Sequence, residues 1–185
     1  MLIKRNIVFL TAGVLALSAG SCGHKKTEEK NYPYRGAIDA YCAAMTAADP
    51  DALMDCSLPA SAAEAVKASP DHDAIYADGK KSLDGLRDQW VSDFGGSPEM
   101  SLAEVKKETR LTEEQCGCAE DYLISAAADY GVTLSDVDVT EGYETDLTLS
   151  LKGSEYETEM NKVCCVVNVS GDGWKLITSP ADKLK

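Results

Sequence analysis

The stretch Tyr143–Ser154, YETDLTLSLKGS, decides the fold class because polar and apolar residues alternate along it. Leu147, Leu149 and Leu151 fall on one side of an extended chain, and polar residues occupy the positions between them. A period of two residues predicts a β-strand with one buried face. The Gly-Ser pair that ends the stretch is typical of a turn, so we expect the chain to reverse there.

A second and a third strand follow this turn. Met160 continues one face of the second strand, whereas Val163 and the apolar residues after it take the opposite parity. Since a β-bulge shifts the parity of a strand, we expect a bulge near Asn161. The segment Ser170–Trp174, SGDGW, predicts a tight turn before a last strand that ends near Thr178.

The residues before this sheet favour helices, because their apolar residues recur every three or four positions. A first helix is expected after Pro33, and a second after Asp49-Pro50, which is typical of an N-cap followed by a first-turn proline. An alanine-rich third helix is predicted over 61–68. A long fourth helix is predicted after Ser69-Pro70, ending at Gly95-Gly96.

One strand, Met100–Arg110, and one further helix complete the pattern. Thr112 and Gln115 have capping-box spacing and are expected to open this helix. Helices followed by antiparallel strands predict an α+β fold, with N-terminal helices packed on a curved antiparallel sheet. We expect residues 32–185 to form a single domain.

The N-terminus has the features of an export signal. Lys4 and Arg5 precede an apolar run over 7–17, which is too short to span a bilayer, and small residues then lead to Cys22. The sequence Ala-Gly-Ser-Cys at 19–22 resembles the bacterial lipobox. The resemblance implies cleavage before Cys22 and attachment of diacylglycerol to its thiol, with acyl chains such as palmitate.

The lipobox resemblance predicts three segments: a signal peptide at 1–21, a lipidated flexible tether at 22–31, and the domain. We expect the domain to be held at the cell membrane on its extracytoplasmic side through the lipid on Cys22. The chain has a formal charge of −13. This charge would repel the phosphates of DNA and RNA, so no nucleic-acid partner is expected.

Six cysteines remain once Cys22 is assigned to lipid: Cys42, Cys56, Cys116, Cys118, Cys164 and Cys165. An even number in an exported chain indicates disulfides. Cys42 and Cys56 are equidistant from the turn at Asp49, so we expect them to face each other across a helical hairpin. Cys116 is expected to pair with Cys165 or with Cys164. Cys118 and the other strand cysteine would then be free or paired at the margin.

Metal binding and catalysis find less support in the sequence. The Cys-x-Cys and Cys-Cys spacings differ from those of zinc sites, and we expect neither a metal nor another cofactor. His72 lies between Asp71 and Asp73. We interpret it as part of a solvated helix start rather than as a carboxylate-oriented base. No recognised catalytic motif is present, and no catalytic residue is predicted.

Two segments, AADPDALMDCSLP (Ala47–Pro59) and VVNVSGDGWKLI (Val166–Ile177), resemble the nuclear-transport-factor-2-like superfamily, and in particular small bacterial lipoproteins of that cone-shaped fold. The resemblance covers about 32–177. It implies a curved sheet folded around a helix, often with a cavity at the wide end, in which some members carry an Asp or His base. This chain has one expected strand before the Thr112 helix, where the superfamily usually has two.

These observations favour a non-enzymatic binding domain for a small molecule or an envelope protein. A structural or assembly lipoprotein that acts through a surface patch is the first alternative. A hydrolase- or isomerase-type enzyme that uses the cone cavity is the second. An open apolar cavity between the long helix and the sheet would favour the small-molecule ligand.

Overall fold

The computed structural model describes residues 31–184. Cys22, the expected signal peptide at 1–21 and all but the last residue of the expected tether lie outside this range. The helices are α1 (Arg35–Ala47), α2 (Pro50–Ser57), α3 (Ala60–Lys67), α4 (His72–Phe94) and α5 (Glu113–Asp129). The strands are β1 (Glu99–Arg110), β2 (Val139–Lys152), β3 (Glu157–Val169) and β4 (Gly173–Ile177), and a short 3-10 turn, η1, covers Ala181–Lys183.

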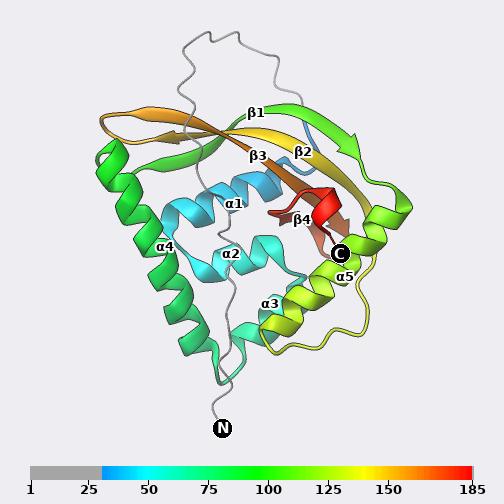
Figure 1. The fold of residues 1–185 in the computed structure, drawn as a ribbon. Helices are drawn as coiled ribbons and strands as arrows, with labels where there is room; N and C mark the ends of the chain where they lie inside the picture. The colour runs from blue at the N-terminus through cyan, green and yellow to red at the C-terminus, as the bar shows by residue number, and fades with distance from the viewer. Residues whose placement is uncertain (1–30, 185) are drawn as a thin grey trace.

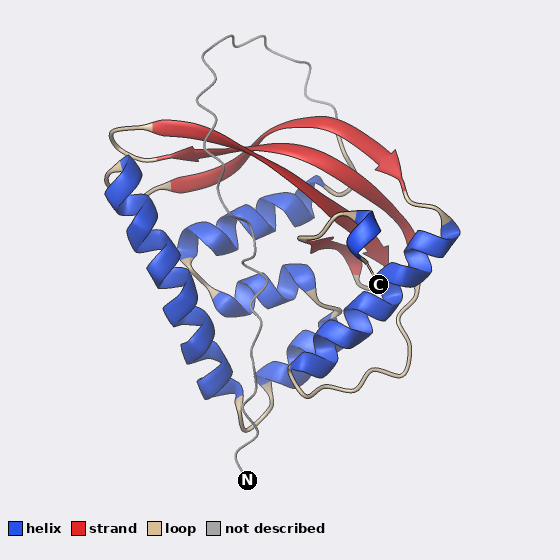
Figure 2. Ribbon diagram, viewed as in Figure 1, coloured by secondary structure: helices blue, strands red, loops and turns tan. Residues whose placement is uncertain are grey.

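The four strands form one antiparallel sheet in the order β1-β2-β3-β4. The sheet curves over α1 and α2, and α4 and α5 descend on either side of them toward α3 (Figures 1 and 2). The predicted α+β class, with helices packed on a curved antiparallel sheet, is therefore confirmed. Within 31–184, a single strand precedes α5, as expected from the sequence.

Two local signals in the sequence place the ends of helices correctly. The Asp49 carboxylate accepts hydrogen bonds from the amides of Asp51 and Ala52, at 3.0 and 3.2 Å, and so caps α2. Thr112 and Gln115 form the predicted capping box at α5, with hydrogen bonds of 2.9 and 3.2 Å. These bonds satisfy amides that the first turn of a helix leaves without partners.

The predicted bulge near Asn161 is wrong. β2 and β3 pair without interruption from Lys152 and Glu157 to Glu141 and Asn168. The apolar residues of β3 change from even-numbered to odd-numbered positions because both faces of the strand are buried in this part of the sheet. Residues 164–167 are all buried: Cys164 and Val166 pack with α1, whereas Cys165 and Val167 pack with α5 and the C-terminal segment. A strand with two buried faces loses the alternation that predicts its register.

Helix α4 is held at its two ends. It begins at His72, with Asp71 at the N-cap position, so the start predicted from Ser69-Pro70 comes too early in the chain. Ile75 packs against residues of α2, α3 and α5 near this end. At the other end the backbone amides of the β2–β3 turn donate to the Phe94 and Gly95 carbonyls, at 3.0 to 3.1 Å.

None of the helices in residues 31–184 has both the length and the apolar character that crossing a membrane requires.

Candidate functional site: a cavity between the helices and the sheet

A cavity of about 440 Å³ lies between the helices and the sheet, and we call it the central cavity. Helices α1, α2, α4 and α5 and all four strands contribute to its lining. Figure 1 shows how α4 and α5 stand apart on either side of α2, with the sheet above them. Cavities of about 300–1,000 Å³ are typical sites for small molecules.

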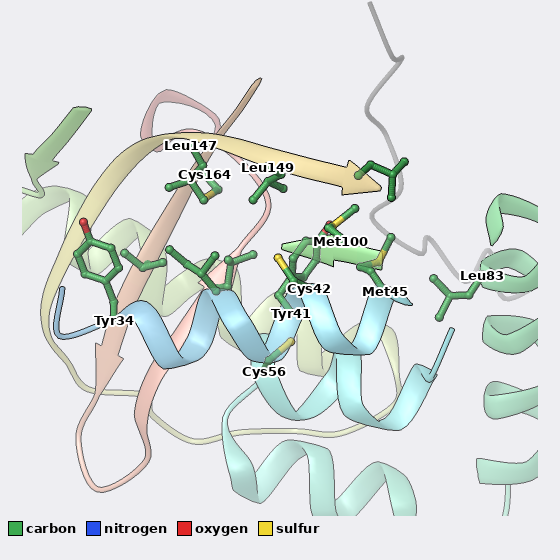
Figure 3. Packing of buried hydrophobic residues seen from close by; sticks show 14 of the residues in the cluster. Tyr34, Tyr41, Cys42, Met45, Cys56, Leu83, Met100, Leu147, Leu149 and Cys164 are labelled. Atoms are coloured by element: carbon green, nitrogen blue, oxygen red, sulfur yellow. The ribbon is translucent and has the colours of Figure 1, made fainter. Parts of the chain in front are cut away.

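The lining is mainly apolar. Buried side chains of α1, α4 and β4 include Tyr41, Trp90 and Leu176. Figure 3 shows side chains of α1 beneath Leu147, Leu149 and Cys164 of the sheet, with Leu83 of α4 to one side. Such a lining gains free energy when an apolar surface displaces water, about 25 cal/mol per Å² of apolar area buried.

Methionine is concentrated at the central cavity. The chain has five methionines, and apart from Met1 every one of them lines it: Met45, Met54, Met100 and Met160. Methionine is unbranched and polarizable, so it adapts its shape to different apolar contacts and is frequent at binding surfaces of broad specificity. This distribution favours a ligand site over a fixed structural void.

The exposed residues of the lining mark its mouth. Ser82, Gly85 and Gln89 lie on α4 and Asp129 lies on α5, and all of them are exposed. The central cavity therefore opens between α4 and α5. A Cβ atom added at Gly85 would have no atom within 4 Å, so the helix backbone borders open space there.

Polar groups interrupt the apolar lining. Lys162 projects from β3, and burial lowers the pKa of its ammonium. Burial also raises the pKa of Tyr41, Tyr122 and Tyr130, so their hydroxyls are neutral hydrogen-bonding groups. The indole nitrogen of Trp90 is buried and has no hydrogen-bond partner among residues 31–184.

The six cysteines of the described chain are all free thiols in the structure, so the expected disulfides are not formed in it. Cys42, Cys56 and Cys164 belong to the apolar cluster beneath the sheet (Figure 3). Cys165 belongs to the cluster on the other face, and Cys116 and Cys118 pack against that cluster.

The two clusters distinguish the two disulfide partners that the sequence leaves possible for Cys116. Cys165 belongs to the cluster that Cys116 packs against, whereas Cys164 lies on the opposite face, because neighbouring residues of a strand point to opposite sides. Burial raises the pKa of the Cys42 thiol to about 12 and that of Cys164 to about 11. These thiols are therefore protonated at neutral pH.

His72 lies at the start of α4, outside the lining of the central cavity. Its Nε2 atom is 2.9 Å from Oδ1 of Asp51 on α2, and its Nδ1 atom is 3.9 Å from Oδ1 of Asp73. The contact with Asp51 ties α4 to α2. Within residues 31–184, no group of three or more His, Cys, Asp or Glu side chains is arranged to hold a metal ion.

Lys162 is not predicted as a site residue from the sequence, because the expected bulge would turn this side chain away from the helices. On the regular strand it shares a face with Met160 and Cys164. The register of β2 with β3 would have placed Lys162 correctly. Leu147 and Leu149 face the core, and they lie opposite Lys162 and Met160.

Comparison of the chain with protein-family models, with curated proteins and with solved structures found no match, so the central cavity and its chemistry are the observations that bear on function.

Proposed function

We propose that this protein binds a small, mainly apolar molecule in the central cavity. The observation that carries the proposal is the cavity of about 440 Å³ with a methionine-rich apolar lining and a mouth between α4 and α5. The volume suits a small molecule, and displacement of water from the lining supplies the driving force.

The structure favours this ligand class over docking through an apolar surface patch. The large apolar side chains that residues 31–184 expose are Val91, Tyr156 and Val163. Single exposed apolar side chains are common on folded proteins and do not by themselves mark an interface. The concentration of methionines at one cavity is the more specific feature.

We extend the proposal to the place where the protein acts. Lipid on Cys22 would hold the domain at the extracytoplasmic face of the cell membrane, with the residues before the domain as a tether. Binding there would remove an apolar molecule from water close to the membrane surface. The lipobox resemblance at residues 19–22 supports this part of the proposal.

Filling the central cavity tests the proposed function. Gly85→Phe places a ring at the mouth, where an added Cβ meets no other atom within 4 Å, and also removes a helix-interior glycine. We expect the dissociation constant of the neutral fluorescent probe N-phenylnaphthylamine to rise about tenfold or more, since overpacking costs about 1–3 kcal/mol. Fluorescence titration gives this constant.

Gly117→Phe is the matched control. Gly117 lies inside α5, an added Cβ there also meets no atom within 4 Å, and the residue does not line the central cavity. This variant should bind the probe as the wild type does. Equal binding by the Gly85 variant, or no probe binding by the wild type, would refute the proposed function.

A further inference from the structure

The chain places a lysine where its neighbours are apolar. Lys162 lies opposite Leu147 in the sheet and on the same face as Met160 and Cys164. Leu147 and Cys164 are buried, and the lysine itself is half-buried and lines the central cavity. Its stem therefore starts in the apolar layer, and the side chain continues along the wall of the central cavity.

The ammonium of Lys162 has no hydrogen bond or ion pair with any residue that the structure describes. Lys175 shows the contrast: it is also buried, but its Nζ atom donates to the Asp55 carbonyl at 3.0 Å. A buried charge without a partner costs free energy, so buried cations are normally paired. Burial of the Lys162 ammonium away from water lowers its pKa, because burial disfavours the charged form.

Residues 31–184 place no counter-ion for Lys162 at the central cavity. Asp129 is the acidic residue of the lining, and it is exposed on α5 at the mouth. No ion pair joins it to Lys162, and no carboxylate is among the groups that shift the pKa of Lys162. A negatively charged occupant of the cavity would supply the counter-ion.

We propose that the ligand is an amphipathic carboxylic acid whose apolar part fills the methionine-rich lining and whose carboxylate meets the ammonium of Lys162. This inference rests on the proposed function and names its ligand class. One lysine matches a group of one negative charge, whereas a phosphate is usually held by several donors. The apolar lining supplies the binding energy, and Lys162 supplies the selection for an acid over a neutral molecule of equal length.

Competition between decanoate and decanol tests the inference. Each is titrated against bound N-phenylnaphthylamine on the full chain carrying Cys22→Ser, which removes the expected lipid. The wild-type cavity should bind decanoate about tenfold or more tightly than decanol, because hydrogen bonds to charged groups are strong in a desolvated site. Lys162→Met should abolish this preference, with both competitors measured against the variant's own affinity for the neutral probe.

Two further variants make the test specific. Lys162→Arg keeps the charge and should keep the preference for decanoate. Lys107→Met removes a lysine from the exposed side of β1, outside the cavity, and should leave the preference unchanged. Equal affinities for acid and alcohol in the wild type, or a preference for decanoate that survives in Lys162→Met, would overturn the inference while the proposed function stands. Failure of the neutral probe to bind would overturn both.

Discussion

Desolvation sets the chemistry of single residues beneath the sheet. It lowers the pKa of Lys162 and raises the pKa of Cys164, which lies two residues further along β3. The two directions have one cause, since burial disfavours the charged form of either group. At neutral pH the thiol is therefore an apolar packing group, and a counter-ion beside Lys162 would offset the cost of burying its ammonium.

At the scale of single residues, we predict a disulfide between Cys42 and Cys56. They lie in one buried cluster, and the proposed export would bring them into an oxidising environment, so we expect them to be linked when the protein is isolated without reductant. A cross-link that closes a loop of about 15 residues stabilises a protein by about 3 kcal/mol, so reduction should lower the free energy of unfolding by that order.

Peptide mapping without reductant shows whether Cys42 and Cys56 are linked. Urea unfolding with and without reductant measures the change in the free energy of unfolding. Cys56→Ala serves as the control, because its stability should not respond to reduction through this pair. Free thiols at Cys42 and Cys56 in the isolated protein would contradict the prediction.

The sequence predicts some single residues of the sheet and misplaces others. On β2 the period-two pattern places Leu147 and Leu149 on the face toward the helices correctly, but it does not predict that Thr148 and Ser150 on the other face are buried as well. On β3 both faces are covered, and the pattern misplaces Lys162. The central cavity itself has no sequence signal of this kind, because it depends on how far α4 stands from the sheet.

At the scale of elements, α4 defines one wall of the central cavity because its ends are held while its middle borders open space. Gly153, in the β2–β3 turn, lies close to the end of α4: an added Cβ would clash with the carbonyl oxygens of Phe94 and Gly95. Only glycine allows this approach. Local signals predict the caps of α2 and α5 well, but they do not show this contact between distant segments.

Gly153→Ala tests how α4 is held. We expect a loss of about 1–3 kcal/mol in the free energy of unfolding, because the added methyl group forces the turn and the end of α4 apart. Urea unfolding followed by circular dichroism measures the loss. Gly36→Ala, inside α1 and with no atom within 4 Å of an added Cβ, is the control and should stabilise the protein or leave it unchanged. Equal stability of the two variants would argue against this role for Gly153.

At the scale of the whole molecule, the proposed lipid anchor on Cys22 would hold an acidic domain at the membrane surface. The full chain has a formal charge of −13, and a negative charge of this size disfavours contact with anionic headgroups. Membership of the nuclear-transport-factor-2-like superfamily stays a prediction from two short segments.

Cys22→Ser tests the anchor. Without the thiol no diacylglycerol can be attached, so the protein should leave the membrane fraction after cell fractionation, whereas Cys118→Ser, which changes a cysteine of the domain, should stay there. The intact mass of the wild type should show loss of residues 1–21 and an acyl adduct. Membrane retention of the Cys22 variant equal to that of the wild type would contradict lipid anchoring through this residue.

The most direct test of the central claim uses the methionines as reporters. Apart from Met1, they all line the central cavity, so isotope-labelled methionine methyl groups observe it from several sides. In an NMR titration with decanoate, we predict saturable shifts of the Met45, Met54, Met100 and Met160 methyl signals, and loss of these shifts in Gly85→Phe. Methyl signals that stay unchanged at saturating decanoate and with the neutral probe would contradict the claim that the central cavity binds a ligand.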